Sequence, residues 1–155
     1  MNDDDTALIR EELILPLIAN FSPDAIVLQC GADALLEDPQ SRLALSNNAH
    51  WAVVAALKPL APRFLALGGG GYNPWSVGRC WTGVWATLAG HEIPDRLDAP
   101  AEAVLRALKW EGQSRIKTPP EPWVTTLRDP HRNGPLSDVI KSRLKSLRDR
   151  SKAWV

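Results

Sequence analysis

Apolar residues recur at helical spacing through residues 6–20, TALIREELILPLIAN. We expect Thr6 to cap this helix and Pro16 to kink it. The next apolar run, AIVLQC at 25–30, has no polar alternation, which is typical of a fully buried strand. A second run of this kind, RFLALG at 63–68, predicts a second buried strand.

Helices are predicted between and after these strands. A loop rich in turn residues follows the first strand, and a helix over 48–60, capped by Asn47 or Asn48, leads to the second. Another helix spans 74–88, and Gly90 suits its end. Alternating strands and helices predict an α/β fold with a parallel sheet covered on both faces.

The second part of the chain has a different pattern. Residues 91–135 are rich in proline, with one short helix expected at 101–110. We therefore divide the chain into a folded portion, 1–97, and an extension, 98–155, which ends in a basic amphipathic helix. Either this helix packs on the domain or frays at the terminus, or it docks a partner. Its apolar stripe consists of Leu136, Ile140, Leu144 and Leu147.

Composition narrows the class of protein. The chain has 155 residues, enough for one domain, and its formal net charge is zero, which gives no electrostatic footprint for nucleic acid or an anionic membrane. No apolar run is long enough to span a bilayer, and the start MNDDD does not resemble a secretory leader. The two cysteines, Cys30 and Cys80, are expected to be buried and reduced, which fits a cytoplasmic protein.

Four consecutive glycines interrupt the chain in LALGGGGYNPW, residues 65–75. The Walker pattern requires Lys-Ser/Thr after the last glycine, where Tyr-Asn stands, and the dinucleotide pattern G-x-G-x-x-G fails because Asn73 occupies its third glycine position. Phosphate binding is therefore disfavoured. Two interpretations remain: a tight turn, or a narrow pocket wall with Tyr72 at its lip, where the phenol can donate a hydrogen bond to a developing oxyanion.

Asp33 and Tyr72 each follow a predicted strand. If the strands are neighbours, they lie ~5 Å apart and their carboxyl ends share one edge of the sheet, so the two side chains can face one crevice. A lone aspartate after a strand is commonly a turn or cap residue; paired with Tyr72 it becomes a candidate metal ligand or base. Asp38, Arg42 and Trp75 are candidates for the mouth of this crevice.

The blocks VLQCGADALLEDPQSRLALSNNAHW, LALGGGGYNPWSVGRCW and HEIP together resemble the zinc-dependent histone deacetylase family, in particular its acetoin utilization branch. The resemblance covers roughly residues 6–97. It implies the C-terminal portion of a three-layer, parallel-sheet arginase/deacetylase-like fold, and a substrate that is an acetylated lysine or a small acetylated amine. It also implies that Asp33 is a zinc ligand, that Tyr72 polarises the acetyl carbonyl, and that Gly69, Gly70 and Gly71 line the substrate channel.

One departure from the family pattern limits these implications. The family's tandem His-His and its Asp-x-His do not precede the GADAL block, and the only D-x-H, Asp129-Pro130-His131, lies downstream, where we expect a solvated loop. Catalytic zinc requires three protein ligands, and Asp33 alone cannot hold it. We therefore expect a truncated chain that is inactive by itself, exposes apolar strand edges and helix faces, and depends on a partner chain or a missing N-terminal part for zinc.

Other interpretations stay open at this point. The chain could be a binding or regulatory module that keeps part of the fold without the chemistry, or, less favoured, a phosphate-ligand domain. Whether it is an enzyme is therefore left undecided by the sequence. Trp81 and Trp85, on the helix after the glycines, are expected to pack beneath the pocket.

Overall fold

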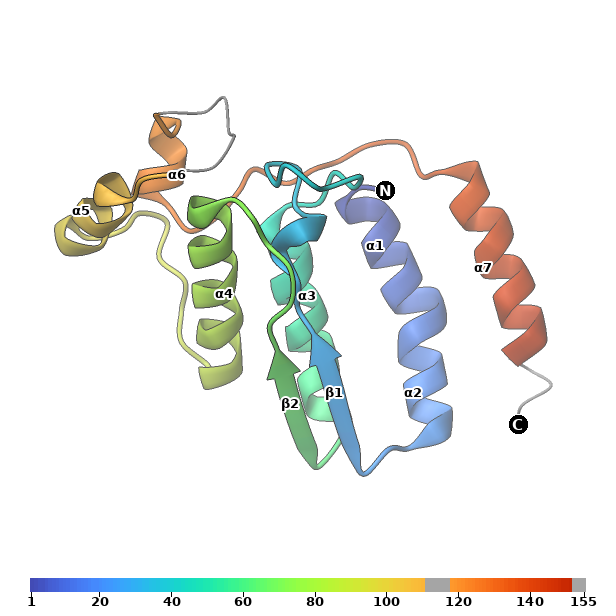
Figure 1. The fold of residues 1–155 in the computed structure, drawn as a ribbon. Coiled ribbons are helices and arrows are strands. Elements are labelled where there is room, and N and C mark those ends of the chain that lie inside the picture. Colours follow the sequence, from blue (N-terminus) through green and yellow to red (C-terminus); the bar gives the residue numbers. More distant parts are fainter. Residues whose placement is uncertain (111–117, 152–155) are drawn as a thin grey trace.

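The computed structural model describes residues 1–110 and 118–151 (Figure 1). Its elements alternate between helix and strand in the first half and are helical afterwards. In chain order they are α1 (Asp3–Ile9), a π-helical segment (Arg10–Ile14), α2 (Leu15–Phe21), β1 (Ala25–Gln29), a 3₁₀ turn (Ala32–Ala34), α3 (Asn47–Leu57), a 3₁₀ turn (Lys58–Leu60), β2 (Arg63–Leu67), α4 (Pro74–Ala89), α5 (Ala99–Ala107), α6 (Glu121–Thr125) and α7 (Asp138–Ser151). None of the described helices is long and apolar enough to cross a membrane.

The first helix begins earlier than its sequence pattern predicts. Asn2, not Thr6, is the cap: its side chain accepts a 2.9 Å hydrogen bond from the Asp5 N–H, and the Asp5 carboxylate accepts one from the Asn2 N–H. The π-helical segment ends two residues before Pro16. Proline has no N–H to donate, and its ring crowds the preceding turn of the helix. The wider π-helical turn therefore lies where the sequence predicts a kink.

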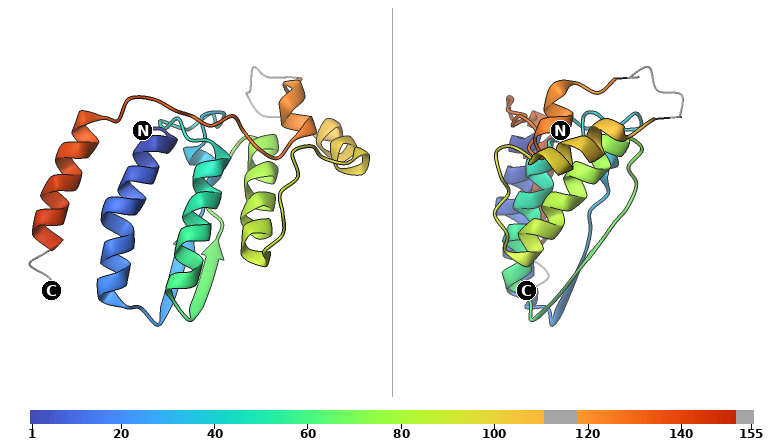
Figure 2. Two further views of the ribbon diagram at one scale, coloured as in Figure 1. Left: turned by 180° about the vertical axis from the view of Figure 1, so that it is seen from behind. Right: turned by 90° about the vertical axis from the view of Figure 1, so that its left-hand side faces the viewer.

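The two strands are parallel, with Ala25 opposite Arg63 and Gln29 opposite Leu67. Helices α2, α3 and α4 lie on one side of this sheet, and among the described residues no helix covers the other side (Figure 2). Val27 is therefore 64% exposed and Leu65 is 53% exposed. The α/β fold with parallel strands is confirmed, but the expectation of fully buried strands covered on both faces is wrong for the described residues.

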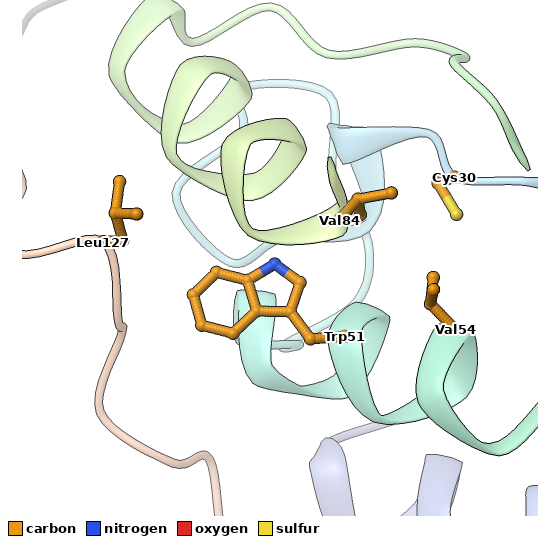
Figure 3. Close-up of a cluster of buried hydrophobic side chains, with 5 residues drawn as sticks. All are labelled: Cys30, Trp51, Val54, Val84 and Leu127. Atoms are coloured by element: carbon orange, nitrogen blue, oxygen red, sulfur yellow. The ribbon is translucent and has the colours of Figure 1, made fainter. Parts of the chain in front are cut away.

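The core lies between the sheet, α3 and α4. Trp51 fits against Gly83, where a Cβ would lie only 2.0 Å from the indole, and its ring N–H donates a 2.9 Å hydrogen bond to the Cys80 carbonyl. Cys30 packs in the same cluster, which Figure 3 shows with Val54, Val84 and Leu127. Both thiols are free and buried, as predicted.

Ser46, and not Asn47 or Asn48 as predicted, occupies the N-cap position of α3, and its hydroxyl donates to the Asp3 carboxylate instead of capping the helix. Asn47 lies at the first helical position instead, and its side-chain amide donates to the Leu127 carbonyl. Helix α4 begins at Pro74, and Gly90 ends it in the left-handed conformation with φ 76°, as the sequence predicts.

The extension packs on the first part of the chain. Trp75 of α4 lies 6.1 Å from Trp110 and 6.2 Å from Trp123, measured between ring centroids. Helix α7 lies beside the α1–α2 helix (Figure 1), with Leu144 buried, while Leu147 is exposed. The expectation that the last helix packs on the domain is confirmed for 138–151; its predicted continuation over 152–155 falls outside the described residues. The division at residue 97 stays a prediction.

Candidate functional site

Two loops leave the sheet together at the carboxyl ends of the strands. The first loop is residues 30–46, after β1, and the glycine loop is residues 68–73, after β2. The strand pairing continues between them: the Cys30 N–H donates to the Leu67 carbonyl at 2.8 Å, and the Ala32 N–H donates to the Gly70 carbonyl at 2.7 Å. The predicted juxtaposition of the two loops at one edge of the sheet is therefore confirmed.

The Asp33 carboxylate lies directly against the glycines. A Cβ at Gly70 would lie 2.2 Å from Asp33 Oδ2, and a Cβ at Gly31 would lie 2.5 Å from Asp33 Oδ1. A Cβ at Gly69 would lie 2.7 Å from the Gly31 Cα. Side chains at these positions would displace the carboxylate or separate the loops, so close approach explains the glycines. Asp33 itself is exposed at the rim.

Tyr72 is held through its backbone. Its N–H donates a 2.6 Å hydrogen bond to Asp38 Oδ2, while the other Asp38 oxygen accepts from the Gln40 N–H at 2.9 Å. Tyr72 is 47% exposed, and Asp38 is buried. The expectation that Asp38 lines the mouth is therefore wrong. Its buried carboxylate accepts hydrogen bonds from one backbone N–H of each loop instead of from water. Gly71, just before Tyr72, has φ 149°, a conformation that favours glycine.

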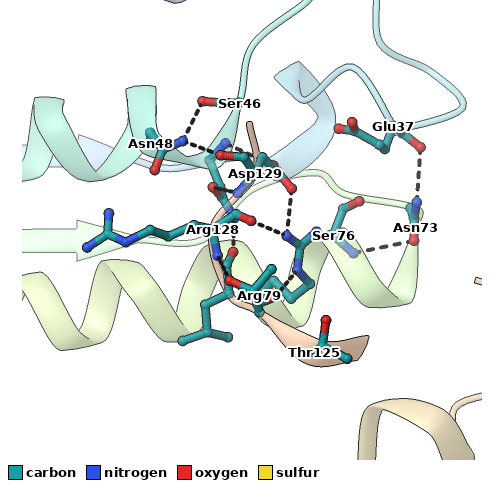
Figure 4. A network of polar contacts seen from close by, with 12 residues as sticks. Glu37, Ser46, Asn48, Asn73, Ser76, Arg79, Thr125, Arg128 and Asp129 are labelled. Carbon is teal, nitrogen blue, oxygen red and sulfur yellow. Dashed lines mark hydrogen bonds and ion pairs between the residues drawn. The ribbon is translucent and has the colours of Figure 1, made fainter. Parts of the chain in front are cut away.

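Asn73 fixes the start of α4 behind the phenol. Its side chain accepts from the Trp75 and Ser76 N–H groups at 3.1 and 3.3 Å, and its amide donates to the Glu37 carbonyl at 3.0 Å (Figure 4). Trp75 is 1% exposed, so it is part of the core and not of the mouth. Of the three mouth candidates, only Arg42 is exposed.

A buried ion pair ties the extension to α4. Arg79 Nη2 lies 2.7 Å from Asp129 Oδ1, and the guanidinium also donates to the Thr126 and Arg128 carbonyls at 2.8 and 3.0 Å (Figure 4). Asp129 Oδ2 accepts from the Asn47 N–H at 3.1 Å. The expectation of a solvated loop at Asp129 is therefore wrong, because the buried guanidinium requires a carboxylate partner.

His131, the other end of that triplet, faces the start of the chain. Its Nδ1 lies 3.0 Å from an Asp3 oxygen, and its ring is about half exposed. The triplet therefore ties the extension to α1 and is not a metal site. His50 on α3 makes a further contact that the sequence did not predict. Its Nε2 donates a 2.8 Å hydrogen bond to the Gly31 carbonyl and so ties the first loop to α3.

The tryptophans after the glycine loop are not buried as predicted. Trp81 is 38% exposed and Trp85 is 60% exposed. Both tryptophans line a hollow between α4 and β2. No further strand pairs with β2 among the described residues. The ring of Trp81 instead shields Gly68, where a Cβ would lie 1.8 Å from it.

The described residues do not fit a catalytic zinc ion. They contain no group of three or more His, Cys, Asp or Glu side chains that could hold a metal. The thiols add no ligand there, because burial raises the pKa of Cys30 and raises that of Cys80 to about 12, which keeps both protonated at neutral pH. Asp33 is therefore a single carboxylate, where catalytic zinc takes three protein ligands.

Comparisons with known proteins agree with this arrangement of strands and loops. The histone deacetylase domain family matches residues 1–88, more than half of the chain, and the chain belongs to that family. A putative histone deacetylase 2 of Caenorhabditis elegans is 39% identical over 97 residues, which are 63% of this chain and 19% of that protein. The histone deacetylase HDAC1 of Drosophila melanogaster is 37% identical over 97 residues, with the same coverage.

A solved structure extends the match into the second half of the chain. The crystal structure of an HDAC homolog from Aquifex aeolicus superposes with a TM-score of 0.80 and 31% identity, covering 94% of this chain and 39% of that one. This chain is therefore a portion of a deacetylase-like α/β fold, and it spans about one fifth of the length of the curated relatives it matches.

Proposed function

We propose that this chain provides part of the active site of a zinc-dependent deacetylase of the acetoin utilization type. The observation that carries the proposal is the position of the Asp33 carboxylate, which lies against Gly31 and Gly70 at the carboxyl ends of two parallel strands. Tyr72 follows Gly70 by two residues in the same loop. Ligand sites in parallel α/β folds lie at this edge. The substrate class is an acetylated lysine or a small acetylated amine, taken from the family.

Each site residue has a role in this proposal. We assign the Asp33 carboxylate, which is exposed at the rim, as the zinc ligand that the described residues supply. Tyr72 presents its hydroxyl to the oxygen of the acetyl group, where loss of one such donor typically lowers kcat by about 10²–10³-fold. Gly69, Gly70 and Gly71 leave room for a thin, extended side chain because no Cβ projects from them.

Because the described residues supply only the Asp33 carboxylate as a zinc ligand, they do not make a complete zinc site by themselves. Zinc in this family would supply a Lewis acid, and one ligand does not retain it. No hydrolytic step is therefore assigned to the chain alone, and activity requires further ligands from outside these residues. The buried, protonated thiols fit a reducing compartment, and we place the protein in the cytoplasm.

A second candidate function follows from the same observation. Two loops with a single carboxylate among the described residues also suit a binding or regulatory module. The two functions differ in what happens when the missing ligands are supplied: a deacetylase portion gains zinc and activity, whereas a binding module gains neither.

The first test is a measurement on the purified chain. We expect less than about 0.1 zinc per chain by elemental mass spectrometry after dialysis, and no hydrolysis of an acetyl-lysine peptide above the background rate. One tightly bound zinc per chain, or hydrolysis that a Tyr72→Phe substitution abolishes, would contradict the proposal that the site is incomplete.

A further inference from the structure

A hollow of about 450 Å³ lies between α7 and the helix formed by α1 and the π-helical segment. Leu8, Leu136 and Leu144 supply its apolar surface, and Leu144 is buried. In Figure 1, α7 stands beside α1 and α2, at the end of the molecule away from α5. We call this hollow the α7 groove. Ligand sites in proteins commonly enclose about 300–1,000 Å³, so the groove has room for several side chains of a partner.

The wall that α7 supplies is basic. Lys141, Lys145 and Arg148 line the groove at positions i, i+4 and i+7, so they lie along one side of the helix over a length of about 10 Å. Their aliphatic stems add apolar surface below the charged groups. Two acidic side chains, Glu12 and Asp149, line the groove as well, so its described lining carries one more positive than negative charge.

The cations of this wall are only partly compensated within the chain. Arg148 Nη1 lies 2.7 Å from Glu12 Oε2 on the opposite wall, and Lys141 Nζ lies 3.2 Å from Asp138 Oδ1 on its own helix. Both pairs are exposed, and exposed pairs contribute little to stability, so these cations can exchange partners at small cost. Lys145, between them along α7, has no ion-pair partner among the described residues.

An apolar floor beneath a row of cations suits one kind of partner. Two helices that lie side by side form a groove into which a third helix can lay its apolar face. A basic partner would place like charges opposite this wall, whereas an acidic one would pair with it. We propose that the α7 groove docks an acidic amphipathic helix of a partner protein, with apolar side chains against Leu136 and Leu144 and a carboxylate on Lys145.

This docking does not depend on the proposed function. The basic wall belongs to α7, which lies outside residues 1–88, the part of the chain that matches the deacetylase domain. The groove is also built from side chains that the candidate site does not use.

Fluorescence anisotropy with designed peptides tests the proposal on the full chain. The probe is a labelled helical peptide with a stripe of leucines flanked by glutamates at i, i+4 and i+7, and a second peptide carries lysine in place of each glutamate. We expect the glutamate peptide to bind and the lysine peptide to bind at least tenfold more weakly. The affinity of the glutamate peptide should fall as NaCl is added, because the Debye length shortens to about 8 Å at 0.15 M ionic strength.

Matched substitutions on the extension locate the site. Lys145→Glu reverses the cation in the groove and should weaken the glutamate peptide at least tenfold. Arg143→Glu makes the same change of net charge at an exposed position of α7 that does not line the groove, and should weaken it less than threefold. Leu136→Ala removes part of the apolar floor and should weaken binding at least threefold. Val139→Ala, at a position outside the groove that is 60% exposed, should have little effect.

Other results would overturn the proposal. These are no binding of the glutamate peptide up to about 1 mM, equal binding of the lysine peptide, or equal losses in Lys145→Glu and Arg143→Glu. Self-association of the chain that Lys145→Glu abolishes, measured by sedimentation velocity, would assign the groove to a second copy instead. Circular dichroism checks that each variant keeps its helix content. If Lys145→Glu loses it, Lys145→Met, which removes the charge and keeps an apolar stem, should show the same weakening.

Discussion

Asp38 accepts a 2.6 Å hydrogen bond from the backbone N–H of Tyr72, although the two residues lie 34 positions apart in the chain. Together with the bond from the Ala32 N–H to the Gly70 carbonyl, it joins the first loop to the glycine loop on both sides of Gly71. The backbone position of Tyr72 is therefore set by a buried carboxylate from the other loop.

Replacing that carboxylate should free the phenol. Asp38→Ala leaves two partly buried backbone donors without their acceptor, which should cost about 1 kcal/mol of stability. Tyr72 is the only tyrosine, so the chain labelled with 3-fluorotyrosine gives a single ¹⁹F resonance. We expect this resonance to shift in Asp38→Ala and to stay near its original position in Asp38→Asn, which keeps one acceptor. Asp95→Ala, at an exposed site, is the control; an equal shift there would contradict the role of Asp38.

We expect substitution by alanine to have opposite effects on stability at two of the glycines. Gly69→Ala places a methyl group 2.7 Å from the Gly31 Cα, a backbone atom that cannot rotate away, and relief of that contact should cost about 1–3 kcal/mol. Gly78 lies inside α4, and a Cβ added there would meet nothing within 4 Å, so Gly78→Ala should stabilise the helix by about 1 kcal/mol. Urea unfolding measures both. Equal changes in the two variants would show that the glycine loop does not require close approach.

The pair formed by Arg79 and Asp129 should be a principal tie between α4 and the extension. Both side chains are almost completely buried, so Asp129→Ala leaves an unpaired guanidinium and should cost about 3–5 kcal/mol. Glu121→Ala breaks an exposed pair with Arg106 and should have a far smaller effect. Thermal unfolding compares the two variants, and similar losses would contradict the importance of the buried pair.

We expect the burial of the Cys80 thiol to lower the stability of the chain at high pH. Burial raises the pKa of Cys80 from 9.0 to about 12, so between these values the unfolded chain releases a proton that the folded chain retains. The free energy of unfolding should therefore be unaffected by this thiol below pH 9 and fall as the pH rises towards 12. Cys80→Ala should flatten this part of the profile. An unchanged slope would show that the thiol does not titrate as its burial requires.

The sequence was sufficient for elements whose signals are local. Pro74 and Gly90 mark the ends of α4, and the two apolar runs give both strands almost to the residue, because these signals depend on neighbours in the chain. The exposure of Val27 and Leu65 was not predictable from the same runs. An apolar strand pattern records the surface that a strand is suited to bury, and not whether the chain supplies a layer to bury it.

The polar contacts of the site were harder to predict for a related reason. Asp38, Asp129 and His50 each contact a residue at least 19 positions away, so no spacing rule connects them with their partners. The resemblance pointed to Asp33 and Tyr72 because their motifs are contiguous. The residues that hold those motifs in place are distributed over the first loop, α3 and the extension.

The most direct test of Asp33 as a zinc ligand is the zinc content of this chain in complex with the unmatched portion of the Aquifex aeolicus homolog. Elemental mass spectrometry should find one zinc per complex, almost none in the chain alone, and at least a tenfold loss of zinc affinity in the Asp33→Asn complex. Full retention of zinc by the Asp33→Asn complex, or a complex of the unaltered chain that binds none, would contradict the assignment of Asp33 as a ligand.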